Sequence, residues 1–112
     1  MIVFLRGFFT VVLVSMLGVT FWAGSQVALW DIPRSVGGHP WFIATLFDTY
    51  WAFFTFFCWV YYRENTLLAR LGWFVGVVLL GNIAMASYML ILLFRLPVTA
   101  SARDILLKPA NR

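Results

Sequence analysis

The sequence predicts an all-α integral membrane protein, a bundle of three transmembrane helices with a short interfacial C-terminal tail. Of its 112 residues, 63% are hydrophobic and 11% are charged, and the mean hydropathy is +0.93. Soluble domains carry ~25% charged residues. The apolar runs are continuous rather than alternating, which favours helices over a membrane barrel. We expect one membrane domain over residues 1–112, with spans at about 2–23, 40–62 and 71–94 and a tail at 95–112.

The first expected span, residues 2–23, carries small residues at helical spacing. Gly7, Ser15 and Gly18 recur on one face, a pattern that lets another helix approach closely. Arg6 lies near enough to the membrane surface for its guanidinium to reach the headgroups. A signal peptide carries its positive charge before the apolar run, so Arg6 inside the run favours a membrane span.

The segment 24–38 reads as a connection on the membrane surface, because it contains a proline, three glycines and the charged residues Asp31 and Arg34. His39 precedes Pro40, a residue favoured at the first helical position, so His39 is expected to cap the second span. His39 is the only histidine in the sequence. A single imidazole could bind a chlorophyll or a haem, although nothing nearby supplies a second ligand.

In the second expected span, residues 40–62, one acid interrupts an aromatic-rich apolar run. At 100° per residue, small and polar side chains gather on one face, which consists of Ala44, Asp48, Ala52 and Thr55. Aromatic rings cover much of the rest, and their surplus is expected to face lipid, a bound pigment or quinone, or a neighbouring subunit. A carboxylate in hydrocarbon is costly, so Asp48 must be protonated, hydrogen-bonded or paired.

The third expected span, residues 71–94, contains a pair of glycines at the spacing of a helix contact. Gly72 and Gly76 form a GxxxG motif, and Ser87 extends the same broad face. The motif predicts tight contact with another helix but not which helix it touches.

Two short polar stretches flank this third span. Before it, Asn65 or Thr66 can cap the start of the helix, and so brief a turn makes the second and third spans antiparallel neighbours. After it, Ser101 and Asp104 have the spacing of a capping box. We therefore expect a short helix at the membrane interface within the tail.

Counting residues inward from the membrane surface gives the depth of the polar groups within three antiparallel spans. Asp48 shares a layer with Ser15, Ser87 and Tyr88, and Asn82 lies farther in. The hydroxyls of that layer are the expected partners of Asp48. Two roles stay open for this acid: a polar contact between helices or with a neighbouring subunit, and a proton-binding site.

The basic residues predict the orientation of the three spans. They divide between the N-terminal side, with Arg6, Arg63 and Arg70, and the side of the tail, with Arg34, Arg95, Arg103, Lys108 and Arg112. The larger number of basic residues on the side of the tail favours a cytoplasmic C-terminus in a bacterial inner membrane.

Two stretches, HPWFIATLFDTYWAFFTFFCWVYYRE and LLGNIAMASYMLILLFRLP, resemble a group of small bacterial three-helix membrane proteins catalogued as a domain of unknown function. The likeness covers most of residues 1–97. It implies a three-span arrangement, and it assigns no activity and no role to any residue.

The leading hypothesis is a non-catalytic accessory or structural subunit in a larger membrane complex, such as a photosynthetic reaction centre with its antenna or a respiratory complex. The alternative is a small oligomeric proton- or ion-coupled transporter that uses Asp48. No enzyme is expected, because the sequence has no Ser/His/Asp set, metal-ligand cluster or phosphate-binding loop.

The expected partners are membrane lipid and other membrane subunits. Nucleic acid is not expected, because the basic residues form no dense stripe. No intrinsic cofactor is expected, although pigment or quinone could contact the aromatic surface. Cys58 is the only cysteine, so it has no partner for an internal disulfide.

Overall fold

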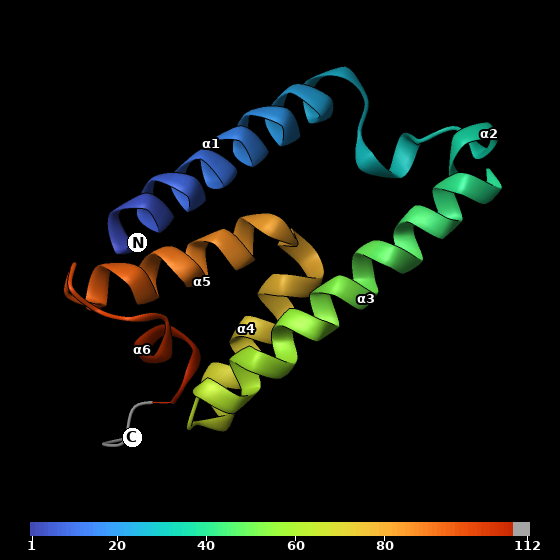
Figure 1. The fold of residues 1–112 in the computed structure, drawn as a ribbon. Helices are drawn as coiled ribbons and strands as arrows, with labels where there is room; N and C mark the ends of the chain where they lie inside the picture. The colour runs from blue at the N-terminus through green and yellow to red at the C-terminus, as the bar shows by residue number, and fades with distance from the viewer. Residues whose placement is uncertain (109–112) are drawn as a thin grey trace.

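The computed structural model of the chain describes residues 1–108, whose regular structure is entirely helical (Figure 1). Two of the helices are long: α1 covers Ile2–Gln26 and α3 covers Pro40–Arg63. Both are long and apolar enough to cross a membrane. At a rise of ~1.5 Å per residue each spans about 36 Å. The first two predicted helices are therefore confirmed as helices, with α1 extending three residues beyond its predicted end.

The connection between the long helices is folded locally. It contains a 3₁₀ turn, η1 (Leu29–Asp31), and a single helical turn, α2 (Arg34–Gly37). The predicted cap of the next helix is confirmed: the His39 side chain accepts a hydrogen bond through Nδ1 from the Trp41 backbone N–H at 3.2 Å. The cap satisfies one of the unpaired N–H groups at the start of α3.

The structure corrects the prediction of one continuous helix over 71–94. The chain forms two 14-residue helices, α4 (Leu67–Leu80) and α5 (Asn82–Arg95), separated by Gly81. The backbone of Gly81 has a φ of 57°, a conformation that L side chains rarely adopt. The ring of Phe53 on α3 occupies the space beside it, with Cζ 2.6 Å from where a Cβ would lie. Because Gly81 has no Cβ, the chain can change direction sharply between α4 and α5, and α3 can pack close to the Gly81 backbone.

The helix caps predicted before α4 and after α5 are present. Thr66 caps α4, with its hydroxyl accepting from the Ala69 N–H at 3.2 Å. Ser101 and Asp104 form the predicted capping box at the start of α6 (Ala102–Leu106). The last part of the predicted tail, residues 109–112, lies outside the described residues.

The two short helices pack on different partners. α4 lies against α3, and α5 lies against α1 (Figure 1). α6 lies near the N-terminus, at the end of the molecule opposite α2. Measured along its principal axes the molecule extends 50 × 27 × 23 Å.

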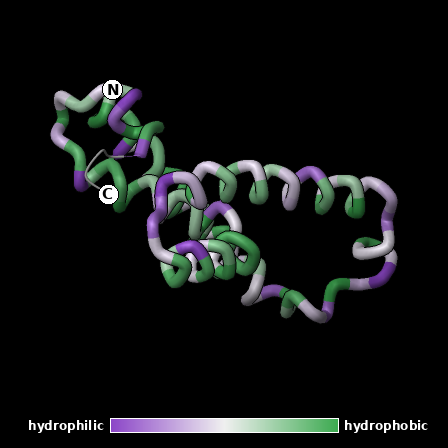
Figure 2. The backbone as a smooth tube through the Cα atoms, turned by 90° about the horizontal axis from the view of Figure 1, so that it is seen from below, coloured by the Kyte–Doolittle hydropathy of each residue, from purple (hydrophilic) through white to green (hydrophobic). Residues whose placement is uncertain are grey.

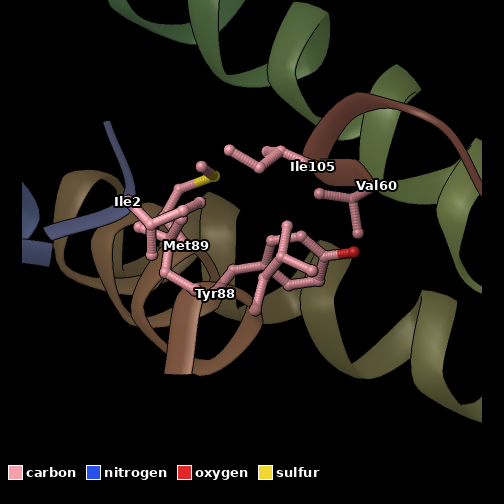
Figure 3. Close-up of a cluster of buried hydrophobic side chains, with 7 residues drawn as sticks. Ile2, Val60, Tyr88, Met89 and Ile105 are labelled. Atoms are coloured by element: carbon pink, nitrogen blue, oxygen red, sulfur yellow. The ribbon is translucent and has the colours of Figure 1, made fainter. Parts of the chain in front are cut away.

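The hydrophobic core lies at the end where α6 packs (Figure 3). Its buried members come from α1, α3, α5 and α6: Ile2, Val60, Tyr88, Met89, Leu92, Leu93 and Ile105. A second, smaller cluster consists of Phe53, Val77 and Ala84, and the Phe53 ring lies against Gly81.

Outside these clusters, most residues of the two long helices are exposed. Ile2 is the only buried residue of α1, and α3 buries Phe53, Val60 and Arg63. Figure 2 shows that hydrophobic residues line much of the helices, while hydrophilic stretches lie mostly at the turns and ends. The chain therefore leaves most of the apolar surface of α1 and α3 without a partner of its own.

Candidate functional site at the cationic end of the molecule

One end of the molecule gathers most of its positive charge. α1 begins there, α3 and α5 end there, α4 begins there, and α6 packs there. We call it the cationic end because it carries six basic side chains, those of Arg6, Arg63, Arg70, Arg95, Arg103 and Lys108. Three of these arginines donate to backbone carbonyls at the ends of helices.

Arg63 at the end of α3 holds α6 in place. It is only 2% exposed. Its Nη1 donates to the carbonyl oxygens of Ile105 and of Leu107, the latter at 3.0 Å. Trp59 Nε1 donates to the carbonyl between them, that of Leu106, at 2.9 Å. Three successive carbonyls at the end of α6 are thereby satisfied by side chains of α3, and the positive charge lies at the negative end of the α6 dipole.

Arg6 performs the same task for α5. Its guanidinium donates to the Leu93 carbonyl through Nε at 3.3 Å and Nη2 at 3.1 Å, and to the Leu96 carbonyl at 2.9 Å. The guanidinium carbon also lies 4.7 Å from the centroid of the Phe94 ring. Within the chain, Nε and Nη2 of Arg6 join α1 to α5; contact of Arg6 with headgroups stays a prediction.

Arg70 on α4 closes the turn from α3. Its Nε donates to the carbonyls of Tyr61 at 3.1 Å and of Glu64 at 3.0 Å. Its guanidinium lies 3.8 Å from the centroid of the Tyr61 ring. Each of the three arginines therefore neutralises the carbonyl end of a helix other than its own.

A polar cavity of about 210 Å³ opens between α3, α4 and α5 at this end. Tyr88 donates its hydroxyl to Glu64 Oε1 at 3.1 Å inside the lining. Arg63 and Arg95 line the same cavity. The cavity pairs two cations with one carboxylate, so it can accept a small polar or anionic group. Among residues 1–108 no group of three or more His, Cys, Asp and Glu side chains is placed to hold a metal ion.

An apolar cavity of about 310 Å³ lies on the other side of α5, and sequence reasoning did not find it. It is lined from α1, α3, α5 and α6 by Phe9, Val12, Phe56, Trp59, Asn82, Met85, Ala86, Met89, Ile105 and Leu106. Its walls come from four helices that lie far apart in the sequence, so no local pattern could have indicated it.

The polar layer predicted around Asp48 does not form within the chain. Asp48 is exposed on α3. The hydroxyls of Ser15 and Ser87 donate to backbone carbonyls of their own helices, at 3.0 and 2.7 Å, and that of Tyr88 donates to Glu64. The prediction assumed a straight third span, and the break at Gly81 displaces Ser87 and Tyr88 toward the cationic end.

The predicted small-residue contacts are mostly unoccupied within the chain. Gly7, Gly18 and Gly72 have no neighbouring heavy atom within 4 Å of an added Cβ, apart from the backbone of their own helix. Gly76 is the exception, because an added Cβ would lie 3.6 Å from the Ala84 Cβ on α5. Contact with another subunit stays a prediction for these residues.

The remaining two site predictions concern single polar residues. Asn82 is exposed at the start of α5 and lines the apolar cavity. His39 is exposed and uses Nδ1 as a helix cap, which leaves Nε2 as its other ring nitrogen. Its binding of a pigment or haem stays a prediction.

The chain was compared with protein families, curated proteins and solved structures. The model of a family described as "Protein of unknown function (DUF1475)" matches residues 2–110. No curated protein and no solved structure matches the chain.

Proposed function

This chain belongs to the DUF1475 family, and on that premise we propose that it is a non-catalytic subunit of a larger membrane protein assembly. α1 and α3 would cross the membrane and present their unpartnered faces to other subunits. The observation that carries the proposal is the exposed carboxyl group of Asp48 on a helix long enough to span the bilayer.

The depth of Asp48 explains why a partner is needed. It lies eight residues after Pro40, about 12 Å along α3 from the start of the helix. An acid at such a depth facing lipid is unfavourable by several kcal/mol unless it is protonated or hydrogen-bonded. The nearest expected donors are bonded elsewhere, so the stabilising contact would come from outside the chain.

The faces of the two long helices support the same conclusion. Gly7 and Gly18 leave open space on α1, and Ala44 and Ala52 flank Asp48 on α3. Between helices in lipid, association depends on close packing and hydrogen bonds, because lipid tails are as apolar as the side chains. Small residues beside a polar group are suited to both, so another transmembrane helix fits these faces better than lipid does.

Native separation after gentle detergent extraction tests the proposal. We expect the tagged chain, of 12.9 kDa, to migrate with other subunits in a much larger band, identified by mass spectrometry. Asp48→Leu should release it, whereas Asp48→Asn, which keeps hydrogen-bonding groups, should remain bound. The matched control is Leu46→Ala, about 160° around α3 from Asp48, which should also remain bound. A wild-type chain that runs alone or as a small self-oligomer would contradict the proposal.

A second candidate, a proton- or ion-coupled transporter, draws on the same exposed carboxyl, since acids within membrane spans often mark proton or ion paths. Asp48→Asn separates the two functions. A subunit keeps its place in the assembly when Asp48 becomes Asn. A transporter in liposomes that contain a pH-sensitive dye loses proton flux with the same substitution.

The narrower assignment to a photosynthetic or respiratory complex rests on aromatic rings alone. Trp22, Trp41, Phe47 and Trp51 are each at least 65% exposed, and such rings suit contact with pigment, quinone or interfacial lipid. The absorption spectrum of the large native band tests this assignment directly, because chlorophyll and haem absorb visible light.

A further inference from the structure

We infer that the cationic end is the surface that meets the anionic headgroups of the cytoplasmic leaflet, and that α4 and α5 dip into this leaflet without crossing the membrane. The inference rests on the membrane location in the proposed function. It places the start of α1 and the helix α6 on the same side, unlike three spans, which would place them on opposite sides.

The lengths of the two short helices are the first observation. α4 and α5 have 14 residues each, which corresponds to about 21 Å per helix. A hydrocarbon core of ~30 Å needs about 20 residues. Neither helix crosses alone, and two in line would exceed the thickness, so their relative direction decides the topology.

The contacts of α5 show that the chain returns to the level where α4 began. Tyr88, at the middle of α5, bonds to Glu64 in the turn before α4. Leu93 near the end of α5 joins Ile2 and Val60 in one buried cluster, and Figures 1 and 3 show these segments together. The pair is therefore a hairpin that opens toward the cationic end.

Two independent measures give the depth of its tip. Gly81 lies against Phe53, which is ten residues before the end of α3, so the tip is about 15 Å from the cationic end along α3. Along α5 itself, Gly81 precedes Leu93 by twelve residues, or at most about 18 Å. Both values reach about half of a ~30 Å hydrocarbon core.

The backbone at the tip is suited to that depth. Gly81 is buried, its N–H donates to the Val77 carbonyl at 2.9 Å, and its carbonyl accepts from the Met85 N–H at 3.0 Å. Irregular backbone is tolerated within a membrane where protein covers it and its polar groups are bonded. The Phe53 ring supplies the cover.

Charge then orients the molecule. Among the described residues the cationic end has the six basic side chains named above and two acids, Glu64 and Asp104. The opposite end has Arg34 and Asp31, whose opposite charges cancel. Basic residues near the ends of spans favour the cytoplasmic side. Of the six, Arg95 and Arg103 are exposed, so their side chains can meet the anionic headgroups of that leaflet. With three spans, the tail would lie on the same side as Arg34, and the basic residues would divide nearly evenly between the two sides of the membrane. With the hairpin, six of the described basic residues lie on one side and one on the other.

Cysteine labelling in a bacterial host tests the arrangement. Single cysteines replace Asn65, Thr99, Ser35 or Leu80 in a chain carrying Cys58→Ser, and a membrane-impermeant maleimide is added to spheroplasts or to inverted vesicles. We expect Asn65→Cys and Thr99→Cys to react only in inverted vesicles, and Ser35→Cys only in spheroplasts. Leu80→Cys beside the tip should react more than about tenfold more slowly than the accessible cysteines in both preparations, because apolar surroundings disfavour the thiolate that reacts with maleimide.

Each contrary result has a distinct meaning. Labelling of Thr99→Cys from the side that labels Ser35→Cys would overturn the hairpin and leave the proposed function standing. Labelling of Asn65→Cys and Thr99→Cys only in spheroplasts would overturn the cytoplasmic orientation. Recovery of the chain outside the membrane fraction would overturn the proposed function itself.

Reporter fusions keep the test independent of these substitutions. On the unsubstituted chain we expect a C-terminal green fluorescent protein to fluoresce and a C-terminal alkaline phosphatase to be inactive, since the phosphatase needs the oxidising periplasm to form its disulfides. An active phosphatase would overturn the inference.

Discussion

Replacing Gly81 with alanine should destabilise the protein, whereas the same change in a continuous helix would stabilise it. The φ of 57° at Gly81 is unfavourable for any residue with a Cβ, and strain of this kind costs about 1–3 kcal/mol. The new Cβ would also lie 2.6 Å from Phe53 Cζ. Phe53 is buried with Val77 and Ala84, and overpacking of such a site costs about 1–3 kcal/mol.

The two contributions predict a loss of about 2–6 kcal/mol in the free energy of unfolding. If residues 71–94 formed one straight helix, Gly81→Ala would instead raise stability by up to about 1 kcal/mol, because alanine is the better helix former. The sign of the change therefore distinguishes the hairpin from a third span.

Unfolding in mild detergent micelles titrated with sodium dodecyl sulfate, followed by circular dichroism, measures this change. Gly72→Ala is the matched control, because Gly72 lies within α4 with open space around it, and it should be neutral or stabilising. In a Phe53→Leu background, the cost of Gly81→Ala should fall to the strain alone, about 1–3 kcal/mol. A stabilising effect of Gly81→Ala would refute the reversal of the chain at this residue.

Two further substitutions probe the cationic end. Arg63→Gln removes charged donors that hold α6, each contributing about 1.5–3 kcal/mol, so trypsin should cleave after Arg103 about tenfold faster or more. The control Arg95→Gln, at an exposed site, should leave the rate of this cleavage unchanged. Equal cleavage of the two variants would contradict the role of Arg63. Tyr88→Phe removes the hydroxyl that donates to Glu64 and should lower the free energy of unfolding by about 1–3 kcal/mol, an effect that should vanish when Glu64 is already alanine. An undiminished effect in the alanine background would show that the hydroxyl acts elsewhere.

Features that depend on neighbours along the chain were predictable from the sequence. The two long helices follow from uninterrupted apolar runs, since the length of such a run predicts a spanning helix without reference to any other segment. The caps at His39, Thr66 and Ser101 follow from residues within three positions of each helix start. In each case the interacting groups are held close by the covalent chain itself.

The return of the chain at Gly81 depends on a contact between distant segments. A glycine in an apolar run is compatible with a straight helix and with a break, and Phe53, packed against it from another helix, stabilises the break. Ser87 and Tyr88 then move away from Asp48, which is why the predicted polar layer is missing. The burial of Arg63 has a similar origin, because its partners lie more than forty residues away on α6.

The sequence by itself determined that the chain is helical, which of its segments are long and apolar, and where most of its helices begin. Tertiary structure alone decided the direction of α5, and with it the two cavities and the gathering of charge at one end. The physical reason is that a helix requires only bonds between residues four apart. The path of one helix past another is set instead by side chains that meet only after folding.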